Sequence, residues 1–225
     1  EGPIRFADNK DGEIYDARLE GLLDAKWDKV KITDHTILPS ASNNFDLVMQ
    51  ERIANPKLIY SPSGKKILDF GQNIAGTFSF KLNAKDGQRI FMRFGELLKD
   101  GEFTQKNIQC VSKKKITPLQ QIEYFCKEGL NDYTMRFAIF GYQYVQIEAD
   151  FDIHTEDFTA IAAYSDFERT FRFDSSNELL NKFVENTFWS LKNNSADLPT
   201  DCPTRERHGW SGDEQLFLNN ATYMV

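Results

Sequence analysis

The fold of this chain is decided by residues 77–94, which contain Thr77-Phe78-Ser79-Phe80-Lys81-Leu82 and, after Asp86-Gly87, Arg89-Ile90-Phe91-Met92-Arg93-Phe94. Both six-residue segments alternate apolar and polar side chains, which is the pattern of a strand with one buried face. An Asp-Gly pair between two such segments favours a tight turn. The sequence therefore predicts a β-hairpin at this point.

Four further segments with a strand-like pattern follow this predicted hairpin. They are residues 122–125, 133–137, 144–147 and 159–164. Many short strands separated by turn residues are typical of two packed antiparallel sheets. We therefore expect a mainly β chain in which residues 1–172 form an antiparallel β-sandwich domain.

The pattern becomes helical after Phe173. Two segments, Ser175–Glu178 and Ser211–Glu214, have the composition of a capping box, with Ser175 and Ser211 as the expected N-caps. Apolar residues at helical spacing follow each of them. We expect residues 173–225 to hold two helices, which are too few for a core of their own and need partners from further sequence.

Composition and charge exclude several classes of protein. The 225 residues carry a formal net charge of −7 and Lys113–Lys115 is the only basic run, so no nucleic-acid partner is expected. No apolar run is long enough to span a bilayer. The cysteines, Cys110, Cys126 and Cys202, lack the spacing of a metal site, so we expect no metal and no other cofactor. Whether Cys110 pairs with Cys126 stays open, as does the oligomeric state.

The loop between the two predicted helices, within residues 198–217, carries the most chemistry. It brings together three acids (Asp201, Glu206 and Asp213), Arg205 and Trp210. These are the residue types of a sugar-cleaving pocket, because a carboxylic acid can protonate the leaving oxygen and carboxylates and Arg can bind hydroxyls. An aromatic face can pack on the C–H side of a sugar ring.

This loop closely resembles the signature of the bacterial α-L-rhamnosidases, in which Asp-Cys-Pro-x-Arg leads through Glu-Arg to Gly-Trp-x-Gly-Asp. Residues 201–213 match it, although the commonest family form has one more Asp between Arg205 and Glu206. Four other landmarks of the family occur in the right order, at residues 12–18, 69–76, 95–98 and 140–145. The resemblance covers nearly the whole chain.

The resemblance implies an inverting glycosidase that removes terminal α-L-rhamnose from oligosaccharides, polysaccharides or glycosides. It implies an (α/α)₆ catalytic barrel, of which residues 173–225 would be the first helices and the acidic loop. The general base of the family is a Glu far downstream of the acid, and no residue of this chain matches it. We therefore expect an internal piece of a longer enzyme, inactive alone; the substrate class favours export, and a cytoplasmic location stays open.

The resemblance also implies roles for the loop residues, each with a structural alternative. Glu206 would be the general acid, or else one half of an Arg–Glu pair that pins the loop. The acid role requires the guanidinium groups of Arg205 and Arg207 to point at other partners, since both would favour the ionised carboxylate. Asp201, Arg205 and Asp213 would bind sugar hydroxyls and Trp210 would form a wall of the site. The alternatives are a turn for Asp201, a favourable helix-dipole position for Asp213 and core packing for Trp210.

Two alternative functions remain at this point. One is a non-catalytic carbohydrate-binding or accessory β-sandwich, and the other is a related glycosidase that acts on another sugar. Outside the loop, Asp69, Gln72 and Asn73 resemble site residues, but we expect them to form a polar turn whose side chains bond the backbone and dock onto the barrel. We expect Glu96 to be structural as well.

Overall fold

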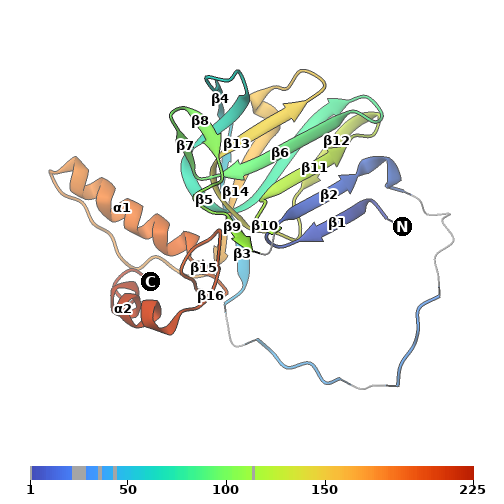
Figure 1. The fold of residues 1–225 in the computed structure, drawn as a ribbon. Coiled ribbons are helices and arrows are strands. Elements are labelled where there is room, and N and C mark those ends of the chain that lie inside the picture. The colour runs from blue at the N-terminus through green and yellow to red at the C-terminus, as the bar shows by residue number, and fades with distance from the viewer. Residues whose placement is uncertain (1, 22–28, 35–36, 43–44, 113–114) are drawn as a thin grey trace.

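The structure is a computed structural model that describes residues 2–21, 29–34, 37–42, 45–112 and 115–225. Figure 1 shows a curled β-sheet with two helices beside one end of it. The strands of the main sheet are β1 (Ile4–Asp8), β2 (Gly12–Asp16), β3 (Leu47–Ala54), β4 (Lys57–Tyr60), β5 (Lys66–Ala84), β6 (Arg89–Gly95), β11 (Gln121–Phe125), β12 (Gly129–Thr134), β13 (Phe140–Ala149) and β14 (Phe158–Ser165).

Short elements complete the fold around this sheet. They are the pairs β7 (Leu97–Lys99) with β8 (Glu102–Thr104), β9 (Cys110–Ser112) with β10 (Lys115–Thr117) and β15 (Ser195–Ala196) with β16 (Leu198–Pro199), the 3₁₀ turns η1 (Ala17–Leu19) and η2 (Thr155–Asp157), and the helices α1 (Glu178–Asn193) and α2 (Ser211–Ala221). The expectation of a mainly β chain that ends in two helices is confirmed.

Strand β5 joins the two layers of the sandwich. Its first half pairs with β4 and β13, and its second half pairs with β14 and β12. Gly76 lies where the strand passes from β13 to β14, and a Cβ there would come within 1.9 Å of the carbonyl oxygen of Ile161. The two layers are thus halves of one sheet, with the order β1-β2-β11-β6-β13-β5-β14-β3, and all its described pairs are antiparallel except β2 with β11.

The predicted hairpin around Asp86-Gly87 is wrong, although the turn itself exists. Gly87 has a φ of +78°, as a turn glycine often does. The strands on its two sides do not pair with each other: β5 ends beside β12, whereas β6 pairs with β11 and β13. The turn therefore carries the chain from one layer to the other. Alternation reports one buried face of a strand and does not report which strand is its neighbour.

Aromatic side chains fill the space between the layers. Phe78 lies at the centre, with ring centroids 5.1 Å from Phe94, 6.0 Å from Phe158 and 6.4 Å from Tyr142. All four side chains are fully buried. Edge-to-face and stacked contacts at such distances add to the stability that burial provides. Six of the 19 phenylalanines of the sequence are buried in this core.

Both helices begin differently from the prediction. The N-cap of α1 is Asn177, whose Oδ1 accepts hydrogen bonds from the N–H groups of Leu179 and Leu180 at 3.0 and 3.3 Å. Ser175 bonds Asn181 instead, because an Asn closer to the helix can cap as well as a Ser. The N-cap of α2 is Trp210, which makes no capping bond with its side chain, and Ser211 is the first helical residue.

Helix α1 packs on the sandwich through few residues. Phe188 and Leu191 are its buried apolar side chains, and the ring of Phe188 lies 6.4 Å from that of Phe167. Leu179 and Phe183 are 82% and 66% exposed. The helical part of the described chain therefore has no apolar core of its own, as expected from its two helices.

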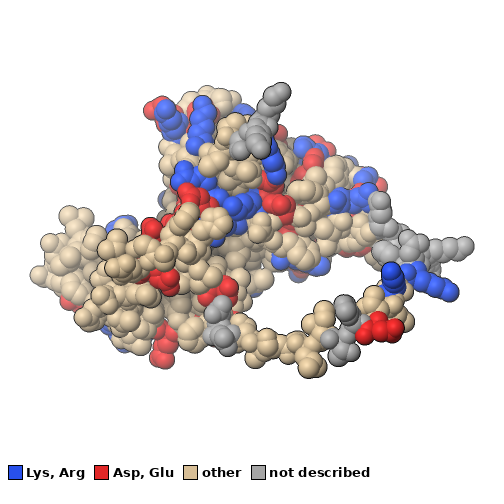
Figure 2. All heavy atoms as spheres, turned by 60° about the horizontal axis from the view of Figure 1, so that its bottom comes forward, with Lys and Arg blue, Asp and Glu red and all other residues tan. Residues whose placement is uncertain are grey.

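The remaining expectations concern cysteines and charge. Cys110, Cys126 and Cys202 are all free thiols, so Cys110 and Cys126 do not pair. No helix within the described ranges is long and apolar enough to cross a membrane. Figure 2 shows Lys and Arg side chains interspersed with Asp and Glu on the face in view. Of the basic run, residues 113 and 114 lie outside the described residues, and Lys115 pairs with Asp11 at 3.1 Å.

Candidate functional site

The acidic loop is a compact turn between α1 and α2. The N–H of Asp201 donates to the carbonyl of His208 at 3.0 Å, and the N–H of His208 donates to Asp201 Oδ1 at 2.9 Å. These two bonds join the two ends of residues 201–208, so that this segment forms a closed loop. Next to them, Gly209 allows Leu198 to approach, since a Cβ on Gly209 would lie 2.3 Å from Leu198 Cδ1. The loop therefore holds its shape through its own contacts.

Asp201 is a structural acceptor in this loop. Besides the His208 N–H, it accepts a bond from the Cys202 thiol at 3.3 Å through Oδ2. Burial acts to raise the pKa of Asp201, but the hydrogen bonds from the His208 N–H and the Cys202 thiol outweigh it and leave that pKa below its usual range. Asp201 is therefore an ionised carboxylate. Its hydrogen bonds within the loop are compatible with both predicted roles, which are forming the turn and binding sugar hydroxyls.

Glu206 has a partner on each carboxylate oxygen. Its Oε1 accepts from Arg205 Nη2 at 3.0 Å, and its Oε2 accepts from the indole N–H of Trp210 at 3.2 Å. The Glu206 side chain is 37% exposed and that of Arg205 is 46% exposed, so the ion pair is in contact with solvent. Of the two arginines that the acid role requires to point elsewhere, Arg205 does not meet the requirement.

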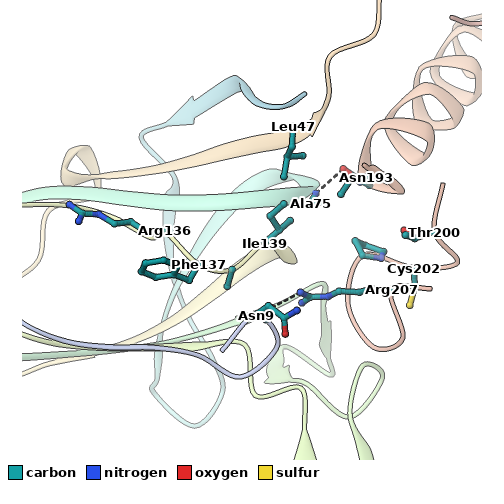
Figure 3. A pocket seen from close by; sticks show the side chains of 13 residues that line it. Asn9, Leu47, Ala75, Arg136, Phe137, Ile139, Asn193, Thr200, Cys202 and Arg207 are labelled. Atoms are coloured by element: carbon teal, nitrogen blue, oxygen red, sulfur yellow. Dashed lines mark hydrogen bonds between the residues drawn. The ribbon is translucent and has the colours of Figure 1, made fainter. Parts of the chain in front are cut away.

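Arg207 does meet this requirement, because it points into the sandwich. Its guanidinium donates to the carbonyls of Thr204 at 3.0 Å and Asn9 at 2.5 Å, and to Gln120 Oε1 at 3.4 Å. Figure 3 shows it reaching from the loop to Asn9. Burial lowers the pKa of Arg207 to about 10. Its φ of +58° is unusual for a residue with a side chain, which indicates that its surroundings hold it in place.

Lys10 anchors the same loop from the turn between β1 and β2. Its ammonium group donates to the carbonyl oxygens of Arg205 and Glu206, at 3.1 Å in both cases. Sequence reasoning missed Lys10 and the structural part of Arg207. The only local signal at Lys10 is a turn, and turn residues do not report a contact nearly two hundred positions away.

Gly141 provides the seat for the loop on β13. A Cβ on Gly141 would lie 2.4 Å from Thr204 Cγ2 and 3.0 Å from Pro203 Cγ, so only glycine allows this approach. Thr204 is buried there. The family-like landmark at residues 140–145 therefore has a physical reason, which is that the loop packs directly against the backbone of the sandwich.

A largely apolar hollow remains where the loop and the sandwich meet. Its lining includes Ala75, Phe137, Ile139, Cys202 and Pro203 (Figure 3). At its edge, the N–H of Ala75 donates to Asn193 Oδ1 at 2.8 Å, which ties the end of α1 to β5. None of the predicted site residues lines this hollow.

A second hollow, of about 360 Å³, brings predicted site residues together. Asp201, Trp210 and Asp213 line it with Leu216 and Phe217. Trp210 is 51% exposed, so core packing is not its role in the described chain. Asp213 is exposed in the first turn of α2. Glu206 and Arg205 do not line this hollow, but the Trp210–Glu206 hydrogen bond connects Glu206 to its wall.

The polar residues at 69–73 and Glu96 behave as predicted for a structural segment. Asp69 Oδ1 accepts from the N–H of Gly71 at 2.8 Å, and Gln72 Nε2 donates to the carbonyl of Asn73 at 2.8 Å. The segment is a bulge within β5 rather than a separate turn. Asn193 of α1 docks onto it by donating to the Asn73 carbonyl at 3.0 Å. Burial raises the pKa of Glu96, which accepts from Asn73 Nδ2 at 3.4 Å.

Two family models match this chain in succession. Residues 59–164 match the bacterial alpha-L-rhamnosidase concanavalin-like domain, and residues 168–225 match the bacterial alpha-L-rhamnosidase six-hairpin glycosidase domain. The second match contains the whole acidic loop. Together the two matches cover most of the chain.

Curated relatives and solved structures agree with these matches. An alpha-L-rhamnosidase of Alteromonas sp. (strain LOR) is 34% identical over all of this chain, and one of Formosa agariphila is 32% identical over 96% of it. The chain spans about a quarter of the length of these relatives, 25% and 24%.

Crystal structures of two enzymes have the same fold in the matching region. For the α-L-rhamnosidase of Aspergillus terreus the TM-score is 0.85 at 30% identity, covering 100% of this chain and 27% of the other. For the Streptomyces avermitilis α-L-rhamnosidase complexed with L-rhamnose it is 0.86 at 28% identity, covering 99% and 22%.

Proposed function

We propose that this chain, which belongs to the bacterial α-L-rhamnosidases, supplies the general acid and part of the sugar-binding wall of an enzyme that hydrolyses terminal α-L-rhamnosides. Glu206 is the acid in this proposal. The position of the Glu206 carboxylate supports this proposal. The carboxylate is accessible to solvent and lies on a loop that is fixed to the sandwich. It accepts a hydrogen bond from Trp210, which lines a hollow together with Asp201 and Asp213.

The contact between Arg205 and Glu206 must change for this role. A guanidinium next to a carboxylate favours its ionised form, and a general acid must carry a proton. Because the pair is solvent-exposed, it is weak and can be exchanged. We propose that hydroxyl groups of the bound sugar draw Arg205 away, which gives Arg205 its substrate-binding role and leaves Glu206 free to become protonated.

Inversion needs a second carboxyl group. In inverting glycosidases the two carboxyl groups stand about 6.5–9.5 Å apart, so that a water molecule fits between the base and the sugar. We place this base in the part of the enzyme that lies outside these 225 residues, since the chain spans about a quarter of its relatives. We also propose that the catalytic domain begins near residue 173.

A non-catalytic sugar-binding loop is the second candidate. The ion pair between Arg205 and Glu206 favours it, because it satisfies Glu206 without any proton transfer. One experiment separates the two. The intact enzyme is given an aryl α-L-rhamnoside, and the first anomer of rhamnose released is identified by NMR. We expect β-L-rhamnose, and we expect its release to be lost in Glu206→Gln. Full activity of that variant would contradict the catalytic role.

A further inference from the structure

A polar hollow lies beside the proposed sugar site, between the bulge of β5 and helix α1. Its volume is about 310 Å³, and its wall consists mainly of amide side chains with one lysine and one tryptophan: Gln72, Gln143, Lys182, Asn186, Trp189 and Asn193. None of the roles described so far uses this hollow. It is formed by both the sandwich and the helical part of the chain.

The polar hollow adjoins the hollow that holds Asp201 and Trp210. Ser190 lines both of them. Along α1, Lys182, Asn186 and Ser190 follow at intervals of four residues, so they lie on one face of the helix. Asn194, the next position in this series, lines the hollow of Asp201. A stripe of polar side chains on α1 and its C-cap residue thus leads from one hollow to the other.

Part of the wall is held rigid by hydrogen bonds. Gln143 Nε2 donates to Asp69 Oδ1 at 2.9 Å and to the Tyr144 hydroxyl at 3.0 Å, and Gln72 Nε2 donates to the Asn73 carbonyl. The side-chain carbonyl oxygens of these two glutamines accept no hydrogen bond from the residues that the structure describes. These oxygens are held in place and can still accept hydrogen bonds from a ligand.

Other wall residues are free donors. Among the described residues, neither the Lys182 ammonium nor the Asn186 amide has a hydrogen-bond or ion-pair partner. Fixed acceptors facing free donors suit hydroxyl groups, because each hydroxyl both donates and accepts a hydrogen bond. An anion would require donors alone. Trp189 adds an apolar surface of the kind that packs against the C–H face of a sugar ring.

We propose that the polar hollow is a second glycosyl-binding subsite, which holds a further sugar residue of the chain whose terminal rhamnose occupies the hollow of Asp201 and Trp210. This inference rests on the proposed function and deepens it. It assigns oligosaccharides or polysaccharides, rather than glycosides with a small leaving group, as the substrate class of the enzyme.

The test compares two substrates of the intact enzyme, an aryl α-L-rhamnoside and a rhamnose-terminated trisaccharide. Asn186→Ala and Lys182→Met each remove one proposed contact to the sugar and no described contact within the protein. Since a hydrogen bond to a ligand is worth roughly 0.5–1.5 kcal/mol, each variant should raise KM for the trisaccharide about twofold to twelvefold. The kinetic constants for the aryl rhamnoside should not change.

Asn83→Ala is the matched control, because Asn83 is an exposed amide on the far half of β5. It should leave both substrates unaffected. If Asn186→Ala and Lys182→Met alter neither substrate, or alter both equally, the second subsite is refuted while the rhamnosidase function stands. If the wild-type enzyme hydrolyses neither substrate, the proposed function itself has failed, so the two failures are distinguishable.

Discussion

Lys10 Nζ lies 3.1 Å from the backbone carbonyl oxygen of Glu206, although 196 positions of sequence separate the two residues. The same ammonium group bonds the carbonyl of Arg205. The β1–β2 turn therefore holds the backbone on both sides of the proposed acid. This contact makes the sandwich part of the machinery that positions Glu206.

Lys10→Met should lower kcat of the intact enzyme about threefold to tenfold with little change in KM, because two hydrogen bonds that orient the acid are lost and the sugar-binding wall is retained. Steady-state kinetics with an aryl α-L-rhamnoside measure this. The control is Lys57→Met, since Lys57 is exposed on β4 and has no described partner. Equal kinetics for the two variants would show that Lys10 does not position Glu206.

Glu206→Gln should reduce turnover of substrates with poor leaving groups by about 10²–10⁴-fold, the usual contribution of general acid catalysis. Substrates whose leaving group needs little protonation should lose much less. Asp201→Asn should affect both kinds alike, because a group that binds hydroxyls acts on the sugar and not on the departing oxygen. The measurement is the ratio of kcat/KM between a poor and a good leaving group. If Asp201→Asn shifts this ratio as much as Glu206→Gln, another carboxyl group is the acid.

Gly141→Ala should destabilise the seat of the loop, because the new Cβ would lie 2.4 Å from Thr204 Cγ2. Overpacking of this kind typically costs about 1–3 kcal/mol. We expect a lower Tm in thermal unfolding of the intact enzyme and a fall in kcat. Thr204→Ser, which deletes the clashing methyl group, should restore part of both in the double variant. A double variant no better than Gly141→Ala alone would mean that the loop is displaced by something else.

The thiols of Cys110 and Cys126 should differ in reactivity in the native protein. Cys110 is exposed and Cys126 is buried, and burial raises the pKa of Cys126 to about 12. At pH 8, iodoacetamide should therefore label Cys110 and leave Cys126 unmodified until the protein is denatured. Peptide mass spectrometry distinguishes the sites. Rapid labelling of native Cys126, or a disulfide between the two residues, would contradict this arrangement.

Residues 1–225 as a separate protein should not hydrolyse an aryl α-L-rhamnoside at an enzymatic rate, because we place the group that activates water outside them. The measurement is release of the aryl group over hours, with the intact enzyme as the positive control. Clear turnover by the separate chain that disappears in Glu206→Gln would mean that the chain contains its own base.

The sequence predicted most where the relevant interactions are local. Alternation located β6, β11 and β14, and helical spacing located α1 and α2, since each pattern reflects one face of one element. The partner of β6 was mispredicted because strand pairing is a property of the whole sheet. Ser175 was the predicted N-cap of α1, but the cap is Asn177. The sequence could not decide between the two, because either side chain can accept hydrogen bonds from the first N–H groups of a helix.

In the candidate site, too, the sequence predicted local groupings but not contacts between distant segments. Asp201, Glu206, Trp210 and Asp213 could be grouped because they lie on one short loop. Lys10 and Gly141 could not, since their contacts with the loop depend on the closed sandwich. The pairing of Arg205 with Glu206 was one of two alternatives for Glu206, and the sequence could not decide between them, because neighbours in a loop face one another only in some backbone conformations.

Strand β5 has a mechanical consequence. Two separate stacked sheets can slide over each other along the plane between them, whereas here one covalent chain runs through both layers and turns from one to the other at Gly76. Shear between the layers would have to stretch that chain. The bulge of β5, which receives Asn193 of α1, is therefore attached to a stiff body. A pull on the helices would be transmitted to the whole sandwich rather than to one of its layers.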